Sequence, residues 1–298
     1  MKKFLIKLGM FVLLVVVCDV CGGLAFRYLL SHAKGGDNGR NNYIHNEMDE
    51  AVLLFGSSRC IHHYDPRIVA DSLSLSCYNC GTDGNGIILF YPRFRMITER
   101  YKPHCIVYDI HAGFDLLKGE PNEKYLSWLR PYYSRVSVDS LFWDISPEER
   151  LKMWSSAYQY NSKLLQLVSD NVHPLQSDIR GYRPVDRTME YDVVPTDSPT
   201  AYCYDGVKLK YLERLAKECK LQGIKLVFAI SPQYKNTSDA VCAPLFDIAG
   251  KYDIPVLNHF CDTSFVNNRS LFYDSVHMNR NGATEYSKLI AGELKTLL

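Results

Sequence analysis

Three short segments of the sequence carry residues that can perform nucleophilic catalysis. The first is Gly56-Ser57-Ser58-Arg59, which follows the apolar run 51–55. A serine directly after a buried strand lies at the sheet edge where ligands bind in open α/β folds. Its hydroxyl attacks a carbonyl only if a base removes the proton, and its backbone N–H can hold a developing oxyanion. Helix capping by the two serines is the alternative explanation of this segment.

The second segment supplies a base. Asp274 precedes His277 by three residues, in a segment that ends shortly before a predicted C-terminal helix. In such a loop the carboxylate can reach back to Nδ1 of the imidazole and leave Nε2 free as general base. A surface loop or a helix cap explains the same spacing without chemistry.

The third segment, residues 79–86, contains three glycines after a short strand candidate. Glycines at such a place let backbone N–H groups approach a ligand closely. A plain turn between a strand and a helix is the alternative.

These segments must be positioned by a larger framework, and the rest of the chain predicts one. Apolar strand candidates at 51–55, 76–79, 105–110, 225–230 and 254–258 alternate with helix patterns at about 87–101, 208–221, 239–252 and 282–298. This alternation predicts an α/β domain over 51–298, with a parallel sheet covered by helices on both faces. The rhythm is lost at about 112–205, which holds Trp128, Trp143 and Trp154. We interpret this stretch as an aromatic-rich insertion, with a helix within 151–168, and expect some of its aromatic side chains to line a substrate cleft.

The first 30 residues read as a signal anchor or transmembrane helix. Lys2, Lys3 and Lys7 precede an apolar stretch long enough for one tilted span, which the acid Asp19 interrupts. Both an uncleaved anchor and a cleaved signal peptide place the remaining chain outside the cytoplasm. Residues 31–50 are polar and rich in Gly and Asn, and predict a linker.

Composition narrows the class of function. The chain has 298 residues, 22% charged residues and a net charge of +1, which does not indicate a nucleic-acid surface. The ten cysteines are compatible with disulfides or with buried thiols. Cys77 and Cys80 lack a second ligand pair, and two adjacent imidazoles (His62 and His63) point apart on a helix, so we expect no metal and no cofactor. We interpret His62 and His63 as exposed helix residues, and Arg59 as a solvated or salt-bridged side chain or, alternatively, as a ligand for an anionic substrate group.

The order of the three segments resembles the SGNH (GDSL-like) hydrolase superfamily. In that family a Gly-x-Ser block follows the first strand, an Asn-x-x-x-x-Gly block follows the second, and an Asp-x-x-His block precedes the last helix. Residues 56–58, 79–84 and 274–277 match these blocks. The resemblance implies a three-layer, flavodoxin-like fold, with Ser58 as nucleophile, His277 as base and Asp274 as its orienting group. It also implies that the N–H groups of Ser58 and Gly84 form the oxyanion hole.

The sequence departs from the family at two places. Ser57 stands where the first block has Asp, a form that resembles the D-alanyl transfer and alginate O-acetylation proteins. The third block, which normally supplies an asparagine donor, is absent, and His111 is the candidate replacement at that place.

The expected function is that of an extracytoplasmic esterase or acylhydrolase that acts through an acyl-enzyme on an acylated small molecule or a cell-surface glycan. Two alternatives remain open. One is acyl transfer to or from a surface glycan, and the other is a non-catalytic accessory role beside partner proteins of envelope assembly.

Overall fold

The computed structural model of the chain describes residues 1–161, 163–174, 178–193, 201–235 and 238–298. These residues form two compact units. Met1–Glu47 and Asn122–Gln176 make up the N-terminal unit, and Met48–Pro121 and Ser177–Leu298 make up the sheet unit.

Five parallel strands form the centre of the sheet unit. They are β1 (Val52–Gly56), β2 (Cys77–Asn79), β3 (Cys105–Asp109), β4 (Lys225–Ile230) and β5 (Val256–Asn258). Their order in the sheet is β2-β1-β3-β4-β5, and every neighbouring pair is parallel. This is the flavodoxin-like order, so the expected fold class is confirmed. Each observed strand lies within two residues of its predicted bounds.

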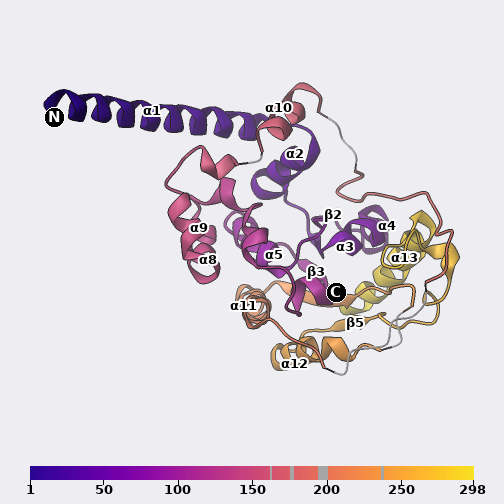
Figure 1. Ribbon diagram of the computed structural model, residues 1–298. Helices are drawn as coiled ribbons and strands as arrows, with labels where there is room; N and C mark the ends of the chain where they lie inside the picture. The colour runs from indigo at the N-terminus through magenta and orange to yellow at the C-terminus, as the bar shows by residue number, and fades with distance from the viewer. Residues whose placement is uncertain (162, 175–177, 194–200, 236–237) are drawn as a thin grey trace. The chain divides into compact units, whose positions relative to one another are not determined.

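Helices cover both faces of this sheet (Figure 1). One face carries α3 (Ser58–His63), α4 (Pro66–Leu73) and α13 (Arg280–Leu297), and the other carries α5 (Ile87–Thr98), α11 (Gly206–Gln222) and α12 (Ala243–Tyr252). Successive side chains of β1 point to opposite faces of the sheet, so this strand contributes to the hydrophobic core on each face. Val52 and Leu54 join the cluster that includes Ile290 of α13, whereas the ring of Phe55 lies 5.4 Å from that of Phe90 in α5.

Capping residues set where the long helices begin and end. The side chain of Asp205 accepts hydrogen bonds from the first turn of α11, and Gly223 ends that helix with a left-handed φ of 71°. Asn279 caps α13 in the same way. The sheet unit also contains α6 (Ala112–Asp115) and the 3₁₀ turns η4 (Ala240–Cys242) and η5 (Arg269–Leu271).

The N-terminal unit is entirely helical in its described part. It consists of α1 (Lys2–His32), α2 (Gly36–Asn42), the π-helix η1 (Tyr43–Glu47), α7 (Glu123–Leu126), η2 (Arg130–Tyr132), α8 (Val136–Ile145), α9 (Pro147–Lys152), η3 (Tyr158–Tyr160) and α10 (Leu164–Val172). The helix expected within 151–168 is therefore split, since α9 ends at Lys152 and α10 begins at Leu164.

The polar segment 31–50, which we predicted as a linker, contains α2 and η1. Three of its four asparagines (Asn38, Asn41 and Asn42) are buried, and two of these donate to buried polar groups. Asn38 donates to the carboxylate of Asp170 at 2.7 Å, and Asn42 donates to the carbonyl oxygens of Leu30 and Ala33 at the end of α1.

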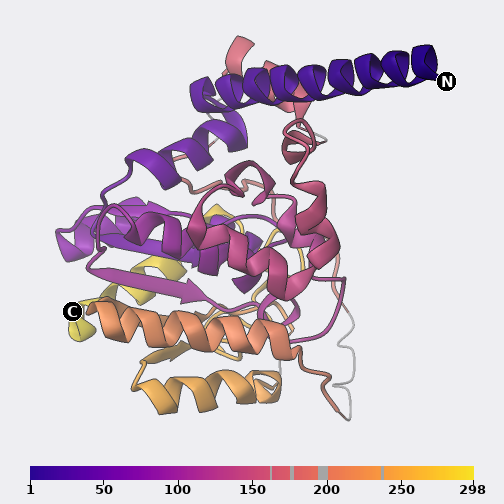
Figure 2. The same ribbon diagram turned by 90° about the vertical axis from the view of Figure 1, so that its left-hand side faces the viewer.

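The helix α1 is long and apolar enough to cross a membrane, with 31 residues and a mean hydropathy of 2.5 in its most apolar window. A signal sequence would have the same properties. Its N-terminal half carries exposed apolar side chains and extends beyond the other helices of the N-terminal unit (Figure 2).

The tryptophans predicted to belong to an insertion over the sheet lie in the N-terminal unit. Two of them contact cations of this unit: Arg150 stacks 3.8 Å from the ring centre of Trp143, and the Lys163 ammonium lies 4.3 Å from that of Trp128. Other aromatics of the segment pair with rings of the same unit, such as Tyr133 with Phe142. Trp143 and Trp154 are nevertheless 51% and 81% exposed, so they are not part of a buried core.

Candidate functional site

The structure brings Ser58, His277 and Asp274 together in one hydrogen-bonded chain. Oγ of Ser58 lies 2.7 Å from Nε2 of His277, and Nδ1 of His277 lies 2.9 Å from Oδ2 of Asp274. A carboxylate can only accept, so Nδ1 carries the imidazole proton and Nε2 is left to accept the proton of Ser58. All three side chains are half-buried, so solvent can still reach these hydrogen-bonded residues.

Asp274 is held as a carboxylate. Partial burial opposes its ionisation, but the hydrogen bond to His277 and the backbone N–H groups of Val276 and His277 outweigh it and lower the pKa of Asp274. Both N–H groups donate to Oδ1 at 2.8 Å. The loop is therefore folded around the carboxylate that pairs with His277.

His63 fastens the same loop to the helix that carries Ser58. Its Nε2 accepts a hydrogen bond from the backbone N–H of Met278 at 3.0 Å, and its side chain is fully buried. Burial lowers the pKa of His63 well below its usual value, so this imidazole is neutral, as an acceptor at Nε2 requires. Our interpretation of His63 as an exposed helix residue is therefore wrong.

His62 was also interpreted as exposed, and it is half-buried against His277. Its ring meets that of His277 edge-on, with 5.5 Å between the centroids, and its Nδ1 lies 2.6 Å from the carbonyl oxygen of Arg183. Nε2 lies 3.7 Å from a carboxylate oxygen of Asp83. The signal that sequence reasoning missed is the spacing of Ser58 and His62, because residues i and i+4 share one face of a helix.

A second segment that sequence reasoning missed borders the site. Residues 178–193 run from the edge strand β2 to the segment before His277. Arg180 accepts at its carbonyl from the N–H of Asn79, Arg183 donates its N–H to the carbonyl of Ile61, and the N–H of Met189 bonds to the carbonyl of Phe272. Side chains add to these backbone contacts, since Arg180 pairs with Glu50 and Asp186 pairs with Arg280, but no local sequence pattern announces partners so far away in the chain.

Gly84 lies in the loop after β2. The first residues of this loop continue the backbone hydrogen bonding with β1. The N–H groups of Cys80 and Thr82 donate to the carbonyl oxygens of Leu54 and Gly56. Gly84 itself has a φ of 64°, which side chains rarely adopt, although a Cβ there would meet open space. Asn79, which begins the same motif, is fully buried, and its amide group donates to the carbonyl oxygens of Cys60 and Tyr64 and so links the loop to α3.

His111 follows β3 as Ser58 follows β1. Gly56 and Asp109 are register partners in neighbouring parallel strands, and Ser58 and His111 each lie two residues beyond them. In the described structure Nδ1 of His111 is buried without a hydrogen-bond partner. Burial lowers the pKa of His111 well below its usual value, so the imidazole is neutral and carries one N–H.

Arg59 is a salt-bridged structural residue and not a solvated one. Its side chain is fully buried and donates to the carbonyl oxygens of Ile110 and Ser231, where β3 and β4 end. Nε lies 3.6 Å from the carboxylate of Asp109, which also accepts from the hydroxyl of Tyr64 at 2.8 Å. Of the two roles that we left open for Arg59, the structure supports the salt bridge.

Within the described ranges, no arrangement of side chains forms a metal site or a disulfide. No group of three or more His, Cys, Asp or Glu residues there can hold a metal ion. All ten cysteines lie in the described part, and no disulfide joins any two of them.

The chain is similar in fold to several solved hydrolases. An acetyl xylan esterase matches with 11% identity and a TM-score of 0.42, over 83% of this chain and 98% of its own. A lipase/acylhydrolase from Enterococcus faecalis matches with 13% identity and a TM-score of 0.42, over 83% and 96%. A GDSL-like lipase from Bacteroides thetaiotaomicron matches with 13% identity and a TM-score of 0.40, over 83% and 88%.

No family model matches the chain, and no curated protein matches it. The TM-scores of the solved structures lie below 0.5 and their identities below 25%. The assignment of the fold therefore rests on the strand order and register of this chain.

Proposed function

We propose that the chain is a membrane-anchored serine esterase or acylhydrolase that acts outside the cytoplasm through an acyl-enzyme. The observation that carries this proposal is the hydrogen-bonded chain from Ser58 through His277 to Asp274. It joins a nucleophile, a base and an orienting carboxylate at the carboxyl edge of a parallel sheet, where such folds bind ligands.

The reaction follows from this geometry. Oγ of Ser58 attacks the carbonyl carbon of the ester while its proton passes to Nε2 of His277, and the carboxylate of Asp274 stabilises the imidazolium. His277 then returns the proton to the departing alcohol, which leaves the acyl group on Ser58. A water molecule, activated by the same imidazole, attacks the acyl-enzyme and releases the acid.

The oxyanion is held by backbone and side-chain donors in this proposal. The N–H groups of Ser58 and Gly84 are the two backbone donors. His111 takes the place of the missing asparagine, because its neutral imidazole offers one N–H at the register-equivalent end of β3. One donor of this kind is typically worth about 10²–10³ in rate.

The membrane anchor in this proposal is α1. Its three lysines, Lys2, Lys3 and Lys7, precede the apolar stretch, which favours retention of that end in the cytoplasm and export of the rest. The substrate would then be an acylated molecule or glycan on the outer side. The alternative reaction uses the same acyl-enzyme but transfers the acyl group to a sugar hydroxyl instead of water. The experiment below distinguishes this transfer from hydrolysis.

A fluorophosphonate probe tests the proposal on the full-length chain in detergent. We expect covalent labelling of the wild type at Ser58, none in Ser58→Ala, and strongly slowed labelling in His277→Ala. A substrate with a labelled acyl group then distinguishes the two reactions. If water alone releases the label from the acyl-enzyme, the chain is a hydrolase. If release requires an added glycan acceptor, it is a transferase. A folded wild-type chain that stays unlabelled would contradict catalysis and favour the accessory role.

A further inference from the structure

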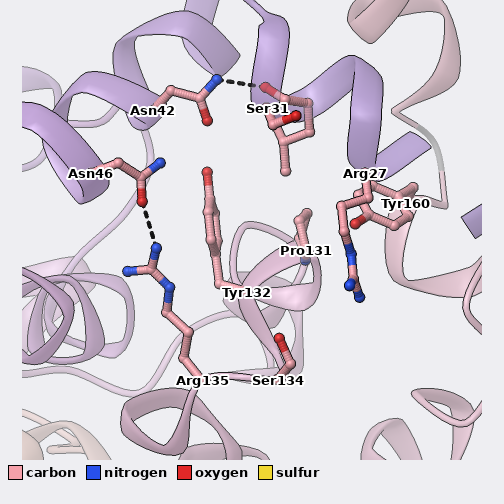
Figure 3. Close-up of a pocket in the computed structure, with 10 residues that line it drawn as sticks. Arg27, Ser31, Asn42, Asn46, Pro131, Tyr132, Ser134, Arg135 and Tyr160 are labelled. Carbon is pink, nitrogen blue, oxygen red and sulfur yellow. Dashed lines mark hydrogen bonds between the residues drawn. The ribbon is translucent and has the colours of Figure 1, made fainter. Parts of the chain in front are cut away.

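The pocket of the N-terminal unit lacks the groups that the proposed reaction needs. It has a volume of about 230 Å³ and lies beside the C-terminal end of α1 (Figure 3). Part of its polar lining is already paired, since Arg135 donates to the side chain of Asn46 at 2.5 Å. None of the described side chains that line it is a carboxylate, a thiol or an imidazole. The imidazoles that surround His277 belong instead to the sheet unit.

His62 lies one helical turn after Ser58, on the same face of α3. Its ring meets that of His277 edge-on, with 5.5 Å between the ring centres and an angle of 82° between the ring planes. The rings of Tyr273 and His63 lie farther from His277, at 6.2 and 6.5 Å. His62 is therefore the nearest of the three rings that the described structure places around His277.

The backbone of Arg183 fixes the orientation of the His62 ring. The carbonyl oxygen of Arg183 lies 2.6 Å from Nδ1 of His62, and because a carbonyl can only accept, Nδ1 carries the proton. The N–H of Arg183 donates to the carbonyl of Ile61 at 3.0 Å, so both backbone groups of Arg183 are bound to consecutive residues of α3. The carboxylate of Asp83 lies 3.7 Å from Nε2 of His62 and 3.7 Å from Nη1 of Arg183. Three segments, α3, the loop after β2 and residues 178–193, thus meet at this imidazole.

The imidazole of His62 is neutral at this place. Burial lowers the pKa of His62, and the hydrogen bond to Arg183 and the charge of Asp83, which raise the pKa, do not compensate. An imidazolium forms on His277 when it takes the proton of Ser58, and a second positive charge beside it would oppose that step. A neutral His62 can therefore support His277 by contact without opposing its protonation.

His277 needs such a contact because the last torsion of a histidine side chain is soft. The hydrogen bond to Asp274 holds Nδ1, but it leaves the ring able to tilt about the bonded nitrogen. A displacement of about 1 Å at a reacting atom can cost about 10²-fold in rate. A ring packed edge-on against the imidazole restricts this tilt, because catalytic side chains are held in place by the packing of their neighbours.

We propose that His62 is a positioning residue of the reaction, whose ring, held by the carbonyl of Arg183, keeps Nε2 of His277 directed at Oγ of Ser58. The proposal rests on the esterase function proposed above, since a positioned imidazole has no task in an inactive chain. His62 acts through His277 and not on the substrate. Its loss should therefore slow the chemical steps and leave substrate binding unchanged.

Two substitutions separate the ring of His62 from its hydrogen bond. His62→Phe keeps a flat ring and loses the donor to Arg183, whereas His62→Asn keeps an N–H near the position of Nδ1 and loses the ring. With the full-length chain in detergent and a small aryl ester, we expect His62→Asn and His62→Ala to lower kcat about tenfold or more, with KM within about twofold of the wild type. His62→Phe should recover most of this loss. The rate of labelling by a fluorophosphonate should follow kcat in each variant.

His259→Ala is the matched control. His259 is a buried histidine of the same unit, and its two ring nitrogens lie 3.0 and 2.9 Å from carboxylate oxygens of Asp262 and Glu293. Its loss should lower the free energy of unfolding and leave kcat unchanged. Equal losses of kcat in His259→Ala and His62→Ala would show a general loss of structure and overturn the positioning role.

The remaining outcomes keep this inference apart from the proposed function. If the wild type is labelled at Ser58 and His62→Ala is labelled equally fast, the positioning role is wrong and the triad stands. If His62→Asn is more active than His62→Phe, the hydrogen bond and not the ring supports catalysis, which also overturns the role. If a folded wild type stays unlabelled, the esterase function fails and the positioning role fails with it. Should urea unfolding show that His62→Ala does not fold, the comparison of His62→Phe with His62→Asn decides.

Discussion

Ser58 and His277 act as one proton-transfer unit in the proposed reaction, because the serine is a nucleophile only while Nε2 can take its proton. We therefore expect Ser58→Ala and His277→Ala each to abolish nearly all hydrolysis of a small aryl ester, and the double substitution to be hardly worse. Losses within such a unit do not add. Steady-state kinetics of the three variants check this, and wild-type-like activity in Ser58→Ala would identify another nucleophile.

Asp115 gives the site a pH-dependent stability. It is fully buried and accepts from the N–H groups of Ile87 and His111 and from the hydroxyl of Tyr108. Burial raises its pKa to about 6, against the hydrogen bonds, which lower it. The folded chain thus holds this proton more tightly than the unfolded chain does. The resulting stability is fully present below the unfolded pKa, near 3.8, and is lost as the pH rises through 6.

Asp115→Asn removes this titration, so comparison with the wild type isolates it. We expect the difference in free energy of unfolding, wild type minus variant, to fall by about 1–2 kcal/mol between pH 5 and pH 8. Urea unfolding at several pH values measures the difference. A difference that grows with pH would mean that the carboxylate is stabilised by the fold.

The candidate site was predictable in part at the level of single residues. Ser58, Asp274 and His277 were found because the triad needs particular residue types at the ends of predicted strands. The contacts of Arg59, His62 and His63 depend on which helix face meets which loop, and residue type alone does not specify that. His62 was within reach of sequence reasoning through its i+4 spacing from Ser58.

At the scale of elements, Arg59 links the carboxyl ends of β3 and β4 through the carbonyls of Ile110 and Ser231 and through Asp109. Arg59→Met would leave the buried carboxylate of Asp109 without its cation. We expect the free energy of unfolding to fall by about 3–5 kcal/mol. Arg67→Met is the control, because the Arg67 side chain is 51% exposed although its partner Asp65 is buried, so its loss should cost clearly less than the loss of the fully buried Arg59. Chemical denaturation compares the two, and similar small losses would contradict a linking role for Arg59.

The loop between β2 and α5 depends on the backbone of Gly84. Its φ of 64° strains any other residue, so we expect Gly84→Ala to lower the free energy of unfolding by about 1 kcal/mol and to slow ester hydrolysis. Gly250→Ala, inside α12 and with open space at its Cβ, should raise stability by up to about 1 kcal/mol and leave activity unchanged. Full activity in Gly84→Ala would contradict a role for Gly84 in the oxyanion hole.

The elements of the sheet were predictable because each strand is a short apolar run between turn residues, and the caps Asp205, Gly223 and Asn279 are visible in the sequence. The segment 31–50 was not, since its buried asparagines read as linker residues until their partners are known. Asn38 has its partner 132 residues away in Asp170. Such a long-range polar contact leaves no local pattern.

At the scale of the whole molecule, the proposed orientation places everything after α1 on the outer side of the membrane. The reason is electrostatic, because lysines flanking an apolar span are retained in the cytoplasm. With a tag at its C-terminus, the chain in spheroplasts should lose that tag to added protease, while a cytosolic marker protein stays intact. The membrane fraction should retain the untreated chain after carbonate extraction, as an uncleaved anchor requires and a cleaved signal peptide does not allow. A tag that is protected until detergent is added would place the Ser58 site in the cytoplasm and contradict the extracytoplasmic substrate class, although the triad itself would stand.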